Sequence, residues 1–231
     1  MKKIKLPQCE IYPLKNFREI LFVAGGRRPD EDFFKKLSFG RKIYAIDKGI
    51  EICRDLNIFP EILIGDFDSA DNSALIWAKN NKIPIEKHPI DKDFTDTQLA
   101  LNLIEKNYSL LPAPYSLIIT GIFGGRFDHL FSNIFTCANS KIRNCLVDEK
   151  ELIFFVKSGE NFSVKFNEMP KNLSLLPITE IVEGVTIKNV HWELENFNLK
   201  QNFPNAISNR VENEKIKISV RSGTLAVYFN F

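Results

Sequence analysis

Residues 62–69 read ILIGDFDS, an apolar run that ends at a glycine and is followed by two aspartates one residue apart. The apolar residues predict a buried strand, and Asp66 and Asp68 come directly after it. If the chain stays extended past Gly65, residues two apart point to the same side. Two such carboxylates repel each other, but a hard divalent cation between them removes this cost because it prefers oxygen ligands. A helix N-cap followed by a surface aspartate would also explain these residues.

The segments on both sides place this strand in a parallel sheet. Apolar runs that read as strands alternate with helix-like stretches through the first two-thirds of the chain, at 19–24, 42–46, 61–65, 83–88 and 115–120. Continuous apolar strands that alternate with helices indicate a parallel sheet covered on both faces. Ligands of such sheets bind beyond the carboxyl ends of the strands, where Asp66 and Asp68 are expected.

The pattern changes after about residue 145. The segments that follow are short, strand-like and separated by turn residues, and several of them alternate. In KIKISV (215–220), for example, Ile216, Ile218 and Val220 point one way. This predicts an antiparallel sandwich or barrel. We therefore expect an α/β parallel-sheet domain over residues 1–145, followed by a small all-β sandwich domain over residues 146–231.

Composition excludes several classes of protein. The 231 residues carry a formal net charge of only +2, which argues against nucleic-acid binding driven by bulk charge. The four cysteines form no C-x-x-C pair and no zinc-like spacing with histidine, so we expect reduced thiols. The basic first residues lack the apolar region of a signal peptide, and no run approaches the ~20 apolar residues of a membrane helix. These features predict a cytoplasmic protein without membrane or nucleic-acid partners.

A second acidic cluster, DKDFTDTQ, occupies residues 91–98. Thr95 and Gln98 match a capping box, so a helix is expected to begin at Asp96. The helix dipole alone accounts for an acid at Asp96. It does not account for Asp91 and Asp93, which lie before the cap.

The third cluster, GIFGGRFDH, occupies residues 121–129 and joins a strand to a helix. A glycine loop that leads into a helix exposes backbone N–H groups that bind phosphate, and Arg126 adds a bidentate phosphate ligand. The loop matches neither the Walker A motif nor G-x-G-x-x-G, so a turn with a charged rim would also fit, and His129 alone is more typical of a helix cap. Together the three clusters indicate metal-assisted phosphoryl or nucleotidyl chemistry.

The three motifs, in this order and spacing, resemble those of the thiamin pyrophosphokinase family. They are GDFDS (65–69), DKDFTD followed by Q-x-A-L (91–101), and GGRFDH (124–129). In the last third, HWEL (191–194) and ISN (207–209) resemble the thiamin-binding β-domain of that family. The resemblance therefore covers nearly the whole chain.

The resemblance implies an enzyme that transfers pyrophosphate from ATP to the hydroxyl of thiamin, giving thiamin diphosphate and AMP. It implies Mg²⁺ as the cofactor and a homodimer whose thiamin site lies between subunits. The implied metal ligands are Asp66, Asp68 and Asp96, which with Arg126 form the catalytic set. The implied ATP-binding residues are Asp47, Gly49, Asp93, Thr95, Gly124, Gly125, Arg126 and Asp128. The implied thiamin-binding residues are Trp192, Ser208 and Asn209.

The sequence departs from the family pattern at two positions. Lys48 replaces a glycine of the A-D-G-G motif, and His191 stands where lysine is frequent.

Three other classes of protein share part of this pattern. A phosphatase of the haloacid dehalogenase type would need its aspartate pair after the first strand, whereas here the pair follows the third. A pyrophosphokinase acting on a hydroxymethyl pterin would use the same N-terminal chemistry, but Trp192 and the Ser208-Asn209 pair favour thiamin as the acceptor. A non-enzymatic nucleotide sensor would keep the phosphate loop without needing the clustered acids. Trp192 could instead have a purely structural role in the core of the sandwich.

Overall fold

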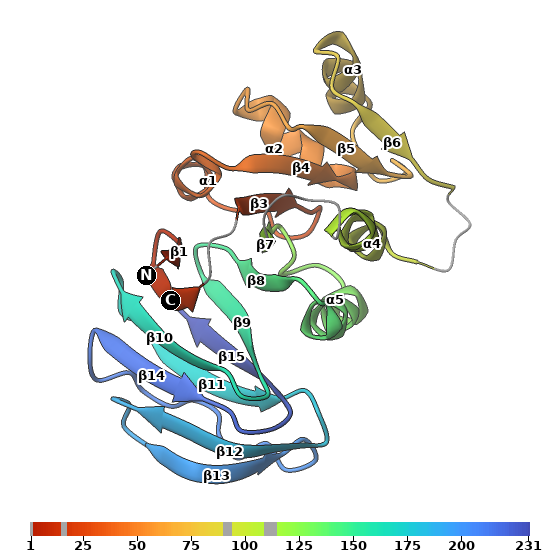
Figure 1. The fold of residues 1–231 in the computed structure, drawn as a ribbon. Coiled ribbons are helices and arrows are strands. Elements are labelled where there is room, and N and C mark those ends of the chain that lie inside the picture. Colours follow the sequence, from red (N-terminus) through yellow and green to blue (C-terminus); the bar gives the residue numbers. More distant parts are fainter. Residues whose placement is uncertain (1, 15–17, 90–93, 109–114) are drawn as a thin grey trace. The chain divides into compact units, whose positions relative to one another are not determined.

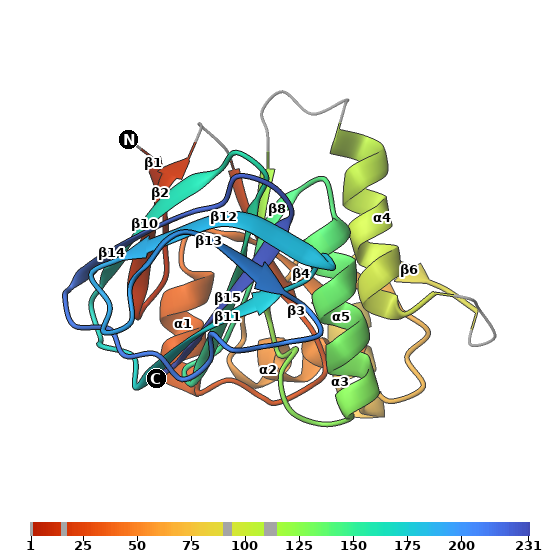
Figure 2. The same cartoon turned by 90° about the horizontal axis from the view of Figure 1, so that it is seen from below.

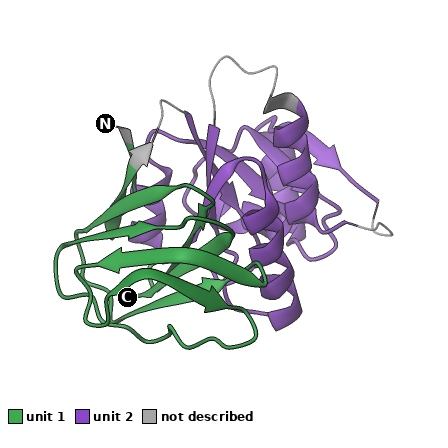
Figure 3. Cartoon of the chain, turned by 60° about the horizontal axis from the view of Figure 1, so that its bottom comes forward, with its two compact units in different colours: residues 1–16, 149–231 green, residues 17–148 purple. Residues whose placement is uncertain are grey.

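The computed structural model of the chain describes residues 2–14, 18–89, 94–108 and 115–231. The chain forms two compact units, which Figure 3 colours separately. Unit 2 comprises residues 17–148, and unit 1 comprises residues 1–16 together with residues 149–231. This division differs from the expected one at the N-terminus, where residues 1–16 belong with the β-rich unit.

The sheet of unit 2 is parallel throughout its described strands (Figure 1). Its strand order is β8-β7-β3-β4-β5-β6. The strands are β3 (Arg18–Val23), β4 (Lys42–Ile46), β5 (Ile62–Gly65), β6 (Ile85–Lys87), β7 (Tyr115–Thr120) and β8 (Arg143–Val147). All six residues of β7 are buried, which fits a central strand covered on both faces. Strand β8 was not among the predicted strands, because it lies where the sequence pattern changes.

Helices connect these strands. They are α1 (Glu31–Ser38), the short 3₁₀ helix η1 (Asp47–Gly49), α2 (Ile50–Asp55), α3 (Asn72–Asn80), α4 (Asp96–Tyr108) and α5 (Phe127–Asn139). The predicted capping box is confirmed, since the Thr95 N–H donates to Gln98 Oε1 at 2.8 Å and the Gln98 N–H donates to Thr95 Oγ1 at 3.2 Å. Figures 1 and 2 show α4 and α5 side by side.

Unit 1 is built from antiparallel strands. One sheet has the order β1-β2-β10-β14-β12-β13, and the strands β11, β15 and β9 are hydrogen-bonded in that order. The bounds are β1 (Lys2–Lys5), β2 (Cys9–Leu14), β9 (Glu151–Lys157), β10 (Asn161–Phe166), β11 (Asn172–Pro177), β12 (Ile181–Lys188), β13 (Leu194–Lys200), β14 (Lys215–Ser219) and β15 (Thr224–Asn230). The predicted alternation in β14 is confirmed, because Ile216 and Ile218 are buried while Lys215 and Lys217 are exposed.

The N-terminal strand β2 belongs to unit 1 because it pairs with β10. Ile11 lies opposite Val164, and Cys9 lies opposite Phe166. Ile11, Cys9 and Val164 are almost completely buried, so the pairing adds apolar side chains to the core of this unit.

Two further observations bear on the predicted class of protein. None of the helices in the described part of the chain has the length and apolar character needed to cross a membrane. All four cysteines are described and buried, and none forms a disulfide. Burial raises the pKa of the Cys53, Cys137 and Cys145 thiols to about 12, so they stay protonated and unreactive.

Candidate active site

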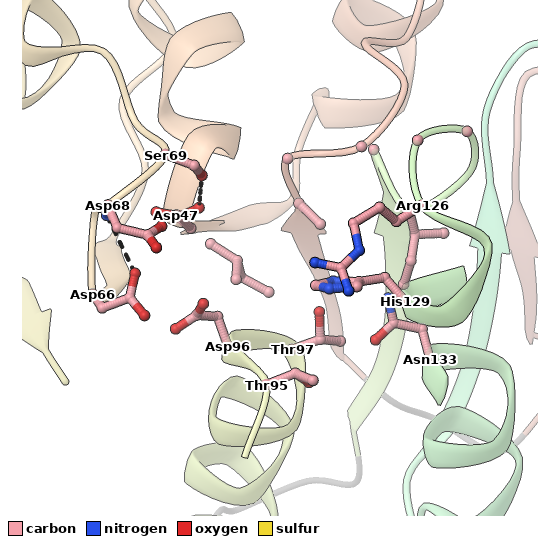
Figure 4. Close-up of a pocket in the computed structure, with 18 residues that line it drawn as sticks. Asp47, Asp66, Asp68, Ser69, Thr95, Asp96, Thr97, Arg126, His129 and Asn133 are labelled. Atoms are coloured by element: carbon pink, nitrogen blue, oxygen red, sulfur yellow. Dashed lines mark hydrogen bonds between the residues drawn. The ribbon is translucent and has the colours of Figure 1, made fainter. Parts of the chain in front are cut away.

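A pocket of about 480 Å³ lies in unit 2, beyond the carboxyl ends of β3, β4, β5 and β7 (Figure 4). This is the edge at which open parallel sheets bind their ligands. The pocket is lined by Ala24, Gly25, Gly26, Ile46, Asp47, Asp66, Asp68, Ser69, Thr95, Asp96, Thr97, Gly121, Ile122, Gly124, Gly125, Arg126, His129 and Asn133. The three motif clusters of the sequence therefore meet in one place, as the sheet-edge argument predicts.

Aspartates form one side of the pocket. Asp47, Asp66 and Asp68 each present a carboxylate oxygen, and these oxygens all lie within 4.8 Å of one another. Asp96, the first residue of α4, also lines the pocket, and Figure 4 shows its carboxylate facing the same space. The predicted metal ligands thus lie in one pocket. The closest carboxylate group, however, includes Asp47, which the resemblance assigned to ATP, rather than Asp96.

The backbone around Asp47 explains how β4 and β5 bring their carboxylates together. Asp47 has a φ of +48°, a left-handed conformation that turns the chain sharply after β4. Gly65 has a φ of +152°, and a Cβ there would lie 3.2 Å from both Cα and Cβ of Asp47. Gly49 packs even more closely, because an added Cβ would lie 1.8 Å from the carbonyl oxygen of Val23. Gly49 does not line the pocket, so the structure gives it a packing role there.

The surroundings of Asp47 favour the protonated form of its carboxyl. The Ser69 hydroxyl donates a hydrogen bond to its Oδ2, while its Oδ1 is buried without a hydrogen-bond partner among the described residues. Burial raises the pKa of the Asp47 carboxyl, the charges of Asp96 and Asp66 raise it further, and the hydrogen bond from Ser69 opposes this shift. A buried carboxylate oxygen without a hydrogen-bond partner, next to two other carboxylates, provides the oxygen ligands that a hard cation would bind.

The glycine loop after β7 forms the opposite side. Gly121, Gly124 and Gly125 have φ values of +68°, +70° and +69°, which glycine adopts at little cost. Next to them, exposed Arg126 donates from Nε to Oδ1 of Asp128 at 3.1 Å and from Nη2 to the other carboxylate oxygen. This ion pair lowers the pKa of Asp128, which does not itself line the pocket. Asp128 is thus a partner of Arg126 in this structure.

Several pocket residues were not among the predicted site residues, namely Ala24, Gly25, Gly26, Ile46, Ser69, Thr97, Gly121, Ile122, His129 and Asn133. A signal for two of them was present: Arg126 is the N-cap of α5, and His129 and Asn133 follow the i, i+4 spacing of one helix face. The spacing puts them on the side of α5 that Figure 4 shows turned to the pocket. Asp93, expected to bind ATP, lies outside the described residues, as does Asp91.

The residues predicted to bind thiamin lie together in unit 1. The Trp192 side chain is not in the core, since the residue is 56% exposed. The guanidinium carbon of Arg210 lies 5.7 Å from the centroid of the indole ring. Asn209 is buried, and its Nδ2 donates to the Trp192 carbonyl at 2.8 Å while its Oδ1 accepts from the Trp192 N–H at 3.1 Å. Its amide therefore holds the Trp192 backbone, whereas Ser208 is exposed.

A sheet-edge pocket that sets clustered carboxylates against a glycine loop and an arginine is typical of enzymes that transfer phosphoryl groups with the help of a metal ion. Comparison with known families narrows this class. The model of the "Thiamin pyrophosphokinase, catalytic domain" matches residues 35–147, and that of the "Thiamin pyrophosphokinase, vitamin B1 binding domain" matches residues 161–225. The chain belongs to the thiamin pyrophosphokinase family.

Individual relatives agree with this assignment. The chain is 27% identical over 184 residues to the thiamine pyrophosphokinase of Bacillus subtilis (strain 168), covering 78% of this chain and 83% of that protein. The crystal structure of thiamine pyrophosphokinase from Bacillus subtilis superposes with a TM-score of 0.78 at 25% identity, over 92% of this chain and 99% of that one. Yeast thiamin pyrophosphokinase shares the fold, with a TM-score of 0.77 at 18% identity over 94% of this chain and 87% of that one.

Proposed function

We propose that the chain transfers the pyrophosphate group of ATP to the hydroxyl of thiamin, giving thiamin diphosphate and AMP. The observation that carries this proposal is the pocket that sets Asp47, Asp66 and Asp68 against a glycine loop and Arg126. Membership of the thiamin pyrophosphokinase family supports the choice of substrates. Unit 2 is the proposed α/β unit for ATP, and unit 1 is the proposed sandwich-type unit for thiamin.

The proposed cofactor is a divalent cation, Mg²⁺, held by the aspartates of the pocket. The donor set supports it, because Asp47 Oδ1 is a buried acceptor without a hydrogen-bond partner among the described residues and lies in the group with Asp66 and Asp68. Asp96 lines the same pocket and completes the proposed set. When bound, the cation would offset the negative charge of the phosphate oxygens during transfer.

The other side of the pocket would bind the phosphates themselves. Backbone N–H groups around Gly124 and Gly125 and the guanidinium of Arg126 are suited to phosphate oxygens. To bind one, Arg126 exchanges its carboxylate partner Asp128 for the phosphate, which costs little because both side chains are exposed. The thiamin oxygen then forms a bond to the β-phosphorus, the bond from that phosphorus to the AMP oxygen breaks, and a carboxylate accepts the hydroxyl proton.

The proposed thiamin site uses Trp192 and Ser208 of unit 1, with Asn209 supporting Trp192. An exposed indole suits the flat aminopyrimidine and the cationic thiazolium of thiamin. We further propose a homodimer in which unit 1 of one subunit completes the site of the other. The reduced, buried cysteines support the cytoplasm as the compartment.

The test is to incubate the protein with ATP, Mg²⁺ and thiamin and to measure AMP and thiamin diphosphate by chromatography and mass spectrometry. We expect both products in equal amounts and none when EDTA replaces Mg²⁺. ADP as the product would contradict pyrophosphate transfer. Turnover of a hydroxymethyl pterin but not of thiamin would change the acceptor, and ATP binding without AMP formation would indicate a nucleotide sensor.

A further inference from the structure

Two loops beside the pocket run along each other after their strands have ended. The Ala24 N–H donates to the Thr120 carbonyl at 2.9 Å, and the Gly26 N–H donates to the Gly121 carbonyl at 2.6 Å. The Arg27 N–H continues this series by donating to the Phe123 carbonyl at 2.5 Å. The parallel pairing of β3 and β7 thus extends into the loops that line the pocket.

Arg27 ties these two loops to the end of a third strand. Its Nε and Nη2 both donate to Oδ2 of Asp148, at 2.8 Å and 2.5 Å, and Asp148 is the residue directly after β8. The Asp148 side chain is 0% exposed, whereas that of Arg27 is 29% exposed. The guanidinium carbon of Arg27 lies 5.8 Å from the centroid of the buried Phe123 ring. One side chain therefore contacts the loop after β7 and the end of β8.

We infer that Arg27 and Asp148 form a positioning pair, which holds the glycine loop 121–126 in the shape that binds the phosphates of ATP. Neither residue lines the pocket, so the pair acts through the loop and not by touching the substrate. The side chain of Arg27 also packs directly against the loop at Gly124. A Cβ added to Gly124 would lie only 2.9 Å from Cβ of Arg27, so the loop has no room to move toward this side chain. This inference rests on the proposed function, in that the loop is taken as the phosphate site.

The need for such a pair follows from the composition of the loop. Glycines at 121, 124 and 125 give it the left-handed conformations it uses, but they also make many other conformations accessible. A charged pair with one buried partner selects one arrangement, since its geometry is satisfied only there. A phosphate site depends on this precision, because displacement of a binding group by about 1 Å can cost up to about a hundredfold in rate.

The experiment compares two pairs in the same unit. Arg27→Gln with Asp148→Asn removes the ion pair without leaving a buried unpaired charge. Arg41→Gln with Glu19→Gln is the matched control: there too Nε and Nη2 donate to one carboxylate oxygen, both at 2.7 Å. That pair lies at the amino ends of β3 and β4, at the edge opposite the pocket. Thermal unfolding, steady-state kinetics for each substrate and MgATP binding by calorimetry are measured for both double variants and wild type.

We expect the Arg27/Asp148 double variant to raise the KM for ATP and the calorimetric Kd of MgATP by about tenfold or more. The KM for thiamin should stay within about twofold of wild type. The control double variant should keep the wild-type KM for ATP and Kd of MgATP even if it loses as much Tm as the Arg27/Asp148 double variant. A purely structural effect would not affect one substrate and spare the other. If a folded Arg27/Asp148 double variant binds MgATP like wild type, the inference is wrong. If the double variant does not fold, the single variant Arg27→Lys is measured instead, because lysine keeps the positive charge but lacks the planar fork of arginine. An unchanged Kd of MgATP in Arg27→Lys overturns the inference.

The calorimetric readout separates this inference from the proposed function. If the wild-type protein binds MgATP but forms no AMP from thiamin, the proposed reaction fails while the effect of the pair on MgATP binding is still measured. If wild type forms both products and the double variant matches it in every constant, the reaction stands and the positioning role fails.

Discussion

Asp68→Asn is expected to stabilise the metal-free protein while it removes the activity. The Asp68 carboxylate lies within 4.8 Å of carboxylate oxygens of both Asp47 and Asp66, so removal of its charge relieves two repulsions. By Coulomb's law each costs about 0.9 kcal/mol at the dielectric constant of water and about 3.5 kcal/mol at an effective value of 20. Because Asp68 is exposed, the lower limit applies, and the gain is about 1–2 kcal/mol in dilute buffer.

The assay is thermal unfolding in EDTA and in Mg²⁺, together with turnover. In EDTA we expect the Tm of Asp68→Asn to exceed that of wild type by about 2–4 °C for each kcal/mol gained. Mg²⁺ should raise the Tm of wild type and have little effect on the variant, since ligands stabilise only the state that binds them. Turnover at saturating Mg²⁺ should fall by about a hundredfold or more, because the charge stabilisation that a metal supplies is worth several kcal/mol.

The control is Asp32→Asn, the same change at an exposed position of α1 that does not line the pocket. It should alter neither turnover nor the Tm gained from Mg²⁺. The reasoning is refuted if Asp68→Asn lowers the Tm in EDTA, keeps the stabilisation by Mg²⁺ and turns over near the wild-type rate. That outcome would leave the carboxylate group as a surface feature without a cation.

Three further predictions concern other parts of the chain. Arg126→Lys should raise the KM for ATP by a larger factor than the KM for thiamin, because lysine lacks the planar fork of arginine. If steady-state assays give the wild-type KM for both substrates, Arg126 is only a surface charge. Hydrogen bonds from the Ser73 and Arg54 side chains lower the pKa of Asp71 to about 2, from an ordinary value of 3.8. Since this pKa is depressed, the stabilisation is present above about pH 4 and lost as the pH falls through about 2, so Asp71→Ala should lower the Tm at pH 7 by more than it does at pH 2. Finally, if subunits share the thiamin site, mixtures of inactive Asp66→Asn and Trp192→Ala proteins should regain activity after subunit exchange, and activity that stays absent after exchange verified by native mass spectrometry would count against the shared site.

The sequence predicted best what short-range chemistry controls. The start of α4 follows from the Thr95–Gln98 capping box, because the atoms that form it lie within one helical turn. The alternation in β14 follows from the period of a strand, which any half-buried strand must show. The meeting of Asp66, Asp96 and Arg126 in one pocket was also predictable, since each follows or faces the carboxyl edge of a parallel sheet.

Only the tertiary structure decided contacts between segments that are far apart in the chain. It assigned β2 to unit 1 through its pairing with β10, about which the local pattern of residues 9–14 carries no information. It gave Gly49 a packing role against Val23, and it turned the amide of Asn209 to the backbone of Trp192.

The group formed by Asp47, Asp66 and Asp68 was likewise determined partly by the sequence and partly by the tertiary structure. The sequence determined that carboxylates would gather beyond β5, because residue types and strand period are local properties. It did not determine that Asp47 would be the third member of the closest group. That depends on a left-handed turn at the end of β4 and on the absence of a side chain at Gly65 in the neighbouring strand, where packing between strands brings the carboxylates within 4.8 Å. Distances of this kind arise only when the sheet has formed, because no single segment contains both partners.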